Sequence, residues 1–355
     1  MAYTTIDNPE LYFQAKTFAG TGASGSTTAV TLDGSEDMAP DMVWVVHRNA
    51  SGNWKGIANT VRGTGKGIHS NTNAIEASSS DYLTAFGSDG FTVGENGSWG
   101  ANGVNYVAYC WKAGTTSGIT TNGSTDVTPS GYSFDQTGKF SVLTYSGNGN
   151  TDNQVAHGIG TAPDFMIVKN ITGSINSYAV YHKYLGNGKY LEFDVTNSVA
   201  TNTNRWQDTT PDTVNFTTGN SDTVNNSSYN YLCFAWAEVK GFSKFGSYTG
   251  NVHADGVFIH LGFKPAFFMV KETGNAEPWV IYDNKRSDSG GPNPNDNHVT
   301  AEGTAAESSG TAIDFLSNGV KLRSNAGHLN EGEYVYMAWA EAPFVNSNGV
   351  PCNAK

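Results

Sequence analysis

The sequence has few charged residues, and positive ones are the scarcer. Asp, Glu, Lys and Arg make up 15% of the 355 residues, against roughly 25% in an average soluble protein. Only 20 Lys and Arg stand against 32 Asp and Glu, a formal net charge of −12. Such a chain offers no basic stripe to neutralise phosphates. We therefore expect no nucleic-acid partner and no binding to an anionic membrane surface.

Cysteines and long apolar runs are also scarce. The three cysteines, Cys110, Cys233 and Cys352, are odd in number and widely spaced, which argues against a disulfide framework. The first two lie inside apolar, strand-like runs and are expected to be buried free thiols. No stretch approaches the length of a membrane helix. The start, Met1–Thr4, lacks a basic segment followed by an apolar one, so we expect no signal peptide and synthesis in a host cytoplasm.

Recognisable catalytic motifs are missing as well. There is no nucleophile elbow, no paired-histidine zinc helix and no phosphate loop. Glu192 and Asp194 alternate with apolar residues, a pattern that favours outward-facing strand positions over a glycosidase pair. The acidic, Gly- and Pro-rich loop 287–298 has oxygen ligands for Ca²⁺ but not the spacing of a known motif. We expect no enzyme, no cofactor and no metal site, and leave Ca²⁺ binding by that loop open.

What the sequence does have is typical of strands and tight turns. Gly is present 42 times, and Thr, Ser and Asn fill much of the remainder. The residues that favour long helices are few, whereas Val, Thr and aromatic residues favour strands and Gly, Asn and Ser favour turns. The composition therefore predicts an all-β fold.

Two sequence landmarks recur three times in the same order. In the first, Pro40, Pro163 and Pro265 each stand at the start of a long apolar run. The second is an aromatic run that ends in tryptophan, and it keeps nearly the same offset from the first in each copy. Its three copies are Tyr106–Trp111, Tyr231–Trp236 and Tyr334–Trp339.

Both landmarks have the character of buried strands. In the tryptophan runs large residues alternate with small ones such as Ala108 and Cys110. This alternation predicts that the large side chains point into a sandwich core while something packs closely against the small ones. We therefore assign six residues to the repeat core: Trp44, Trp111, Phe165, Trp236, Phe267 and Trp339.

The landmarks divide the chain into three tandem β-sandwich repeats of about 100 residues, the size of a small sandwich domain. The predicted boundaries are an N-terminal arm (1–17), repeat 1 (18–115), a linker (116–137), repeat 2 (138–242), repeat 3 (243–345) and a C-terminal tail (346–355).

Four segments in order resemble a repeated domain of virion structural proteins from marine tailed phages, including cyanophages. They are Ala39–Val45, Val61–Lys66, Ser88–Gly94 and Tyr106–Gly114. The end of the chain, Met337–Asn346, is similar to the end of the same proteins. The resemblance implies lectin-like (jelly-roll) β-sandwiches in a virion structural protein, without an established enzyme activity.

The resemblance leads to the expectation of a protein displayed on the particle surface, as a head decoration, a fibre or part of the tail. Its expected partners are other virion proteins, further copies of itself (a trimer among the options) and a host cell-surface glycan. The alternative is a carbohydrate-binding module of the tail, and a polysaccharide depolymerase is less favoured. Three tryptophans in polar, loop-like surroundings are the candidate glycan contacts: Trp54, Trp99 and Trp206.

Overall fold

The computed structural model describes residues 2–22, 25–287 and 293–352. Within these residues the chain is nearly all β, with 26 strands and three helical segments of three or four residues. No helix in this part of the chain is long and apolar enough to cross a membrane. The all-β prediction is confirmed. The helical segments are η1 (Pro9–Leu11), α1 (Thr203–Trp206) and α2 (Gly327–Asn330).

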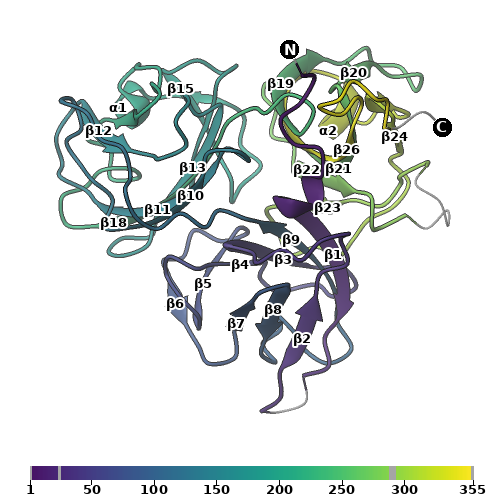
Figure 1. Ribbon diagram of the computed structural model, residues 1–355, viewed down its shortest axis with the longest axis horizontal. Helices are drawn as coiled ribbons and strands as arrows, with labels where there is room; N and C mark the ends of the chain where they lie inside the picture. The colour runs from purple at the N-terminus through teal and green to yellow at the C-terminus, as the bar shows by residue number, and fades with distance from the viewer. Residues whose placement is uncertain (1, 23–24, 288–292, 353–355) are drawn as a thin grey trace.

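The strands form three lobes around a common centre (Figure 1). Each lobe has one large sheet and one small sheet, and neighbouring strands within a sheet run antiparallel. In the first lobe (residues 13–111) the large sheet has the order β1 (Phe13–Ala19), β9 (Asn105–Trp111), β3 (Met42–His47), β4 (Gly56–Asn59), β5 (Lys66–His69), β6 (Ala77–Ser78), and the small sheet β2 (Thr28–Thr31), β8 (Gly90–Val93), β7 (Leu83–Gly87).

The second lobe (residues 131–236) has the large sheet β10 (Gly131–Asp135), β11 (Phe140–Ser146), β18 (Asn230–Trp236), β13 (Phe165–Asn170), β14 (Ala179–His182), β15 (Lys189–Glu192), β16 (Ala200–Thr201), and the small sheet β12 (Asn153–Ala156), β17 (Asn215–Thr218). The third lobe (residues 243–343) has the large sheet β19 (Ser243–Thr249), β26 (Glu333–Pro343), β21 (Phe263–Glu272), β22 (Trp279–Asp283), β23 (Val299–Thr300), and the small sheet β20 (Phe258–His260), β25 (Gly319–Leu322), β24 (Ile313–Leu316).

The three large sheets share one strand order and one register. In each, the strand of the tryptophan landmark lies between an early strand of the lobe and the strand of the proline landmark. Across that second pairing, the tryptophan always faces the second residue after the landmark proline. The three pairs are Trp111 with Met42, Trp236 with Phe165 and Trp339 with Phe267. Residues at matching places in this register of the three lobes are equivalent residues.

The large and small faces of the tryptophan strands are buried in different places. In β9 the small residues Ala108 and Cys110 pack inside the first lobe, in a cluster with Val43 and Val45. Trp111 and Tyr109 point the other way, into a core shared by all three lobes. The prediction that the large residues fill each sandwich is therefore wrong. Both faces of a strand covered on both sides are apolar, so alternation alone does not identify the inner one.

The centre of the shared core is a triangle of tryptophans, one from each lobe. The ring centroids of Trp111 and Trp339 are 5.1 Å apart, those of Trp111 and Trp236 5.9 Å, and those of Trp236 and Trp339 6.0 Å. All three contacts are edge-to-face, the arrangement that aromatic quadrupoles favour. The apolar space left beside them is about 10 Å³, which is no more than one water molecule occupies. The lobes are thus closed onto each other without a central channel.

The last residues of the predicted N-terminal arm (1–17) belong to the first lobe. Phe13–Ala19 is strand β1, paired along its whole length with β9. The Phe13 ring is buried and stacks on Trp339 of the third lobe at 5.5 Å, so removal of residues 1–17 would take away part of the shared core. The predicted linker also contains structure, since strand β10 lies within it.

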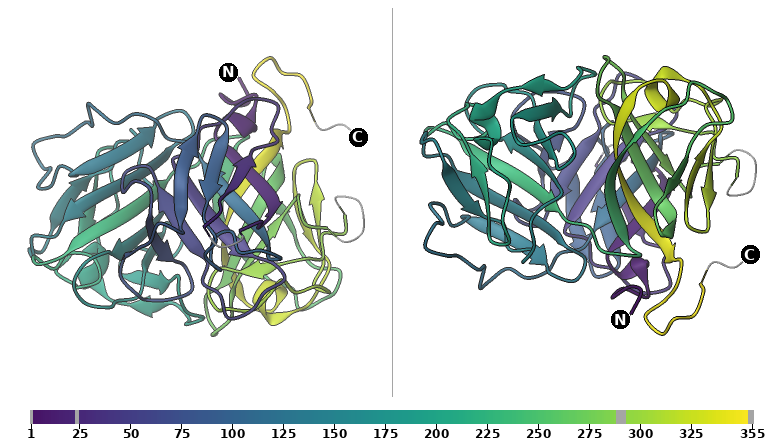
Figure 2. Two further views of the ribbon diagram at one scale, coloured as in Figure 1. Left: turned by 90° about the horizontal axis from the view of Figure 1, so that it is seen from below. Right: turned by 90° about the horizontal axis from the view of Figure 1, so that it is seen from above.

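The segments at the two ends of the chain lie on the same side of the molecule (Figure 2). The backbone N–H and the hydroxyl of Ser347 donate hydrogen bonds to the carboxylate of Asp7 at 2.7 and 2.5 Å. The hydroxyl of Tyr3 donates to the carbonyl of Gly262 at 2.8 Å. The predicted C-terminal tail is therefore in contact with the N-terminal segment through Ser347.

Because the tryptophan triangle joins all three lobes, truncating one of its members should destabilise the whole chain. We expect Trp111→Ala to lower the free energy of unfolding by about 3–5 kcal/mol, the usual cost of removing a buried large aromatic side chain. Urea unfolding followed by circular dichroism measures this change. The matched control is Trp54→Ala, at an exposed tryptophan, which should cost under about 1 kcal/mol. Equal losses for the two variants would contradict the triangle's role.

Candidate functional site

The six residues assigned to the repeat core are all buried, none with more than 2% of its surface exposed. They lie in the core shared by the three lobes. Trp44 illustrates their position, because its ring packs against Phe193 of the second lobe at 5.4 Å while its Nε1 donates to Ser70 Oγ at 3.2 Å. These residues hold the lobes together and do not line a binding surface.

Two of the three candidate glycan contacts are wrong. Trp99 is fully buried and Trp206 is 1% exposed. Trp99 fills the space left by Gly56 and Gly67, where a Cβ would come within 2.5 and 3.2 Å of its ring. Trp206, in α1, packs edge-on against Tyr181 at 5.8 Å. Their polar sequence neighbours are short turns over an apolar interior, so local composition misled the prediction. Trp54, at 45% exposed, is accessible.

A ring of equivalent hydrogen bonds joins the lobes. In each lobe, one residue just before or at the start of the strand β4, β14 or β22 reaches across to the next lobe. Its side chain donates a hydrogen bond to a backbone carbonyl of that lobe. The three acceptor residues are also equivalent, because each is the strand-register partner of the residue that follows the donor of its own lobe. The bonds run from Lys55 Nζ to Thr300 (2.6 Å), from Tyr178 Oη to His69 (2.9 Å) and from Trp279 Nε1 to Glu192 (2.8 Å).

Two further sets of equivalent hydrogen bonds accompany this ring. The backbone N–H of each donor residue is bound by a side-chain oxygen from its own lobe, that of Asn71, Asp194 or Glu302 respectively, at 2.9–3.0 Å. A backbone ring also crosses the lobe boundaries. Its bonds run from Glu307 N to Arg48 O (2.7 Å), from Glu76 N to Ile171 O (3.4 Å) and from Val199 N to Thr273 O (2.9 Å). The chain thus closes on itself with three matching interfaces.

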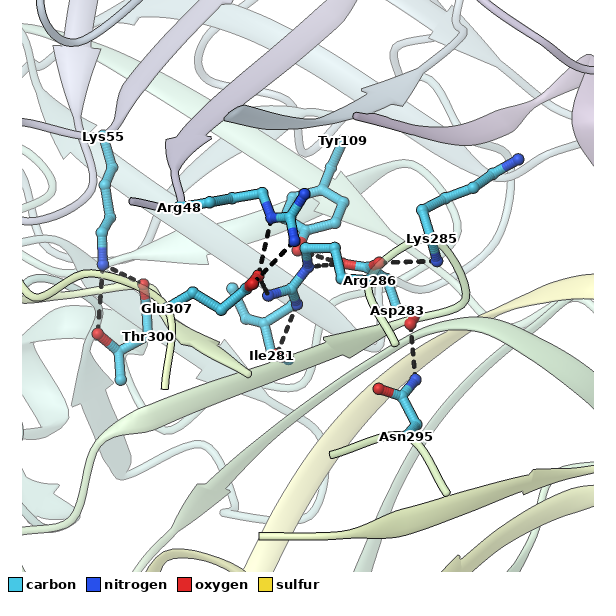
Figure 3. Close-up of polar contacts among 10 residues, drawn as sticks. All are labelled: Arg48, Lys55, Tyr109, Ile281, Asp283, Lys285, Arg286, Asn295, Thr300 and Glu307. Atoms are coloured by element: carbon cyan, nitrogen blue, oxygen red, sulfur yellow. Dashed lines mark hydrogen bonds and ion pairs between the residues drawn. The ribbon is translucent and has the colours of Figure 1, made fainter. Parts of the chain in front are cut away.

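The interface between the first and third lobes also contains a buried ionic network (Figure 3). The Tyr109 hydroxyl donates to Asp283 at 2.7 Å, and Asp283 accepts from Arg286 Nε at 2.5 Å. Arg286 Nη1 then donates to Glu307 at 2.7 Å, and Glu307 accepts two further bonds from Arg48 at 2.8 and 3.0 Å. Although burial raises the pKa of Glu307, the two guanidinium groups outweigh it and hold the pKa low. Each charge in the network is paired.

A second buried cluster surrounds the inter-lobe bond of Lys55. Burial lowers the pKa of the Lys55 and Lys271 ammonium groups to about 8 and raises that of Glu302 to about 7. Shifts of this size are common at catalytic sites. Here each group is already occupied: Lys55 on the Thr300 carbonyl, Glu302 on the Trp279 N–H and Lys271 on the Glu272 carbonyl. All three residues are buried and engaged in this way, so the cluster serves the interface.

The carboxylate pair of the second lobe is engaged in the same way. Asp194 is buried and accepts the backbone N–H of Tyr178, and Glu192 forms a 3.2 Å ion pair with Arg205. The expectation that both face outward is therefore wrong for Asp194. The two side chains are structural acceptors, and the arrangement gives no support to glycoside hydrolysis.

The cysteines and the candidate metal ligands likewise give no support to a catalytic site. The thiols of Cys110 and Cys233 are buried, which raises their pKa, and Cys352 is exposed. No group of three His, Cys, Asp or Glu that could hold a metal ion occurs in the described part of the chain. In the loop considered for Ca²⁺, residues 288–292 lie outside the described residues, and Asn295 Nδ2 donates to the carbonyl of Asp283.

An open groove lies between the two terminal segments, with a volume of about 440 Å³. Lys240, its one charged lining residue, stands over the ring of Tyr3 at 4.5 Å. The groove is lined by Ala2, Tyr3, Lys240, Ser347, Asn348 and Gly349.

Fold and site together define an all-β protein of three mutually closed lobes, with many of its buried charged and aromatic side chains committed to the lobe interfaces. The chain belongs to the family described as domain of unknown function DUF7483, whose model matches residues 8–343. Comparison with curated proteins and with solved structures gives no match.

Acid should weaken the fold through its buried histidines. Burial lowers the pKa of four of them to about 4: His69, His157, His182 and His298. In the unfolded chain a histidine titrates near 6.5. The unfolded state therefore takes up protons first as the pH falls, and stability is lost between about pH 6.5 and pH 4. Glu302, with its raised pKa, acts in the opposite sense between about pH 7 and pH 4.5.

His182 is suited to a test of this effect, because the equivalent position of the first lobe holds Asn59, an uncharged residue that the fold accepts there. We expect His182→Asn to reduce the loss of unfolding free energy between pH 6.5 and pH 4 by up to about 3 kcal/mol. Urea unfolding at the two pH values measures the difference. His253→Asn, which makes the same replacement at an exposed position, is the matched control. An unaltered pH dependence in His182→Asn would refute the assignment.

The ionic network gives a second prediction. Arg286→Leu leaves the Asp283 carboxylate buried without its partner, and we expect a loss of about 3–5 kcal/mol in unfolding free energy. Leucine is the equivalent residue, Leu185, in the second lobe. Adding Asp283→Asn removes the stranded charge and should restore part of the loss. The coupling is measured in a double-mutant cycle by urea unfolding, and purely additive losses would contradict it.

Proposed function

We propose that the chain is a non-enzymatic structural protein of a phage particle, displayed on the particle surface as three tandem copies of one β-sandwich repeat. The shared strand order of the large sheets and the equivalent inter-lobe bonds support the tandem copies. The resemblance of segments such as Tyr106–Gly114 to marine phage proteins supports the virion assignment.

The observation that carries this proposal is the closure of the three lobes onto one aromatic core. A rigid closed body with loops of Gly, Asn, Ser and Thr suits display, because a scaffold that does not deform leaves its loops free to differ. The buried acids and bases belong to the interfaces between lobes, which favours a structural role over an enzymatic one.

Attachment to the particle is proposed to use the side on which the two terminal segments meet. Asp7 and Ser347 join these segments, and the groove beside them is open. The proposed partners are other virion proteins. The apolar faces that would hold three separate repeats together are buried between the lobes of this chain. Any homo-oligomer must therefore form through the outer surface.

Immunogold electron microscopy of intact phage, with an antibody against this chain, tests the assignment. We expect label on the particle. Label over the head indicates a decoration protein, and label at the tail indicates a role in host attachment. The virion proposal would be contradicted if particles carried no label although the antibody detected the chain in the same lysate.

A carbohydrate-binding module of the tail is the second candidate, and the exposed Trp54 favours it. A polysaccharide depolymerase is less favoured, because the acidic pair Glu192 and Asp194 is engaged by Arg205 and by the Tyr178 N–H.

A further inference from the structure

One tryptophan of the chain is unlike the other seven. Of eight tryptophans, Trp54 is 45% exposed, while the remaining seven are at most 2% exposed. Large aromatic side chains are usually buried, and where they stand exposed on a rigid surface they are frequent anchors of binding. Trp54 therefore has a role other than the core packing that the seven buried tryptophans provide.

Trp54 is held in place on both sides. The side chain of Asn71 accepts the N–H of Lys55 at 2.9 Å and donates to the carbonyls of Asn53 at 3.2 Å and Gly303 at 2.9 Å. One amide thus fixes the residues before and after the tryptophan and ties them to the third lobe. A loop backbone fixed in advance loses less conformational entropy when a ligand arrives.

The indole of Trp54 also packs against a buried aromatic side chain. Its ring is tilted by 52° to that of His69, with centroids 4.8 Å apart, and His69 meets Tyr82 edge-on at 5.7 Å. Tyr82 in turn contacts the buried Trp99 at 5.7 Å. Trp54 is the exposed end of this aromatic column.

The shared architecture of the lobes does not require this tryptophan. The equivalent positions, one residue before the inter-lobe donors Tyr178 and Trp279, are Ser177 and Pro278. The side chain is a feature of the first lobe's loop alone.

The surroundings of Trp54 indicate the chemistry of its ligand. The side chain of Asn53 is a neutral amide next to it, with Gly97 against its Oδ1, while the amide of Asn71 is engaged by the three backbone hydrogen bonds described above. The ammonium of Lys55 is turned inward onto the Thr300 carbonyl and is buried. A flat apolar ring beside a neutral amide matches a neutral sugar, whose C–H face stacks on the indole while its hydroxyls bond to the amide.

We propose that Trp54, with the amide of Asn53, binds a neutral glycan by stacking on one pyranose face. The inference rests on the proposed display at the particle surface and supplies a ligand class for it. The described part of the chain has one such site, so firm attachment comes from the many copies on a particle.

The test is binding of neutral hexasaccharides of glucose, mannose and galactose, followed by saturation-transfer NMR and by acrylamide quenching. Because the other tryptophans are buried, the quenchable fluorescence reports Trp54, and a bound sugar should shield it. We expect Trp54→Ala to weaken binding at least about tenfold and Trp54→Phe to retain part of it. Tyr184→Ala, which removes another exposed aromatic, is the control and should bind normally.

Circular dichroism and urea unfolding verify that the variants are folded. Binding by Trp54→Ala equal to the unchanged chain overturns the proposal, as does the absence of binding for all three sugars at millimolar concentration. Trp54 that is shielded on intact particles but indifferent to sugars marks a protein contact, which also overturns it. Each of these three outcomes leaves the virion assignment standing if particles carry the immunogold label, so the two proposals can fail separately.

Discussion

The structure depends on the contact of three tryptophans at its centre. Trp111, Trp236 and Trp339 lie on equivalent strands of different lobes and meet edge-to-face. Each large sheet thereby has two buried faces, one inside its lobe and one against the other lobes. A sheet with two buried faces needs strands that are apolar on both sides, which explains why the tryptophan runs alternate between large and small residues without a polar face.

The inter-lobe ring shows how one geometric task is met by unlike side chains. Lys55, Tyr178 and Trp279 occupy equivalent places and all donate to a carbonyl of the neighbouring lobe. An ammonium, a phenol and an indole share only a long apolar stem and a donor at its tip. The cost of burying the ammonium is visible in the lowered pKa of Lys55, which the other two donors avoid because they are neutral.

The sequence was sufficient to identify the strands of the proline and tryptophan landmarks but not what covers them. The offsets between the proline and tryptophan landmarks match the observed register, in which Trp111, Trp236 and Trp339 face Met42, Phe165 and Phe267. The direction of the tryptophans could not be predicted, because it depends on which neighbour covers each face. Phe13 was missed as a strand residue for a similar reason: its partner Trp111 and its stacking partner Trp339 are distant in sequence.

For the candidate site, local composition was a poor guide to exposure. Trp54, Trp99 and Trp206 all lie among Asn, Ser, Gly and Thr, and only the first is accessible. For Trp99 the difference arises from the absence of a side chain at Gly56 and Gly67, which admits its ring to the interior.

Closure of the lobes explains why loops at equivalent positions can differ so much. Since the interfaces are held by a shared core and by backbone carbonyls, a loop residue such as Trp54 can diverge from Ser177 and Pro278 without loss of the assembly. Covalent linkage of the three lobes in one chain thus permits an asymmetric surface that a homotrimer of identical chains cannot have.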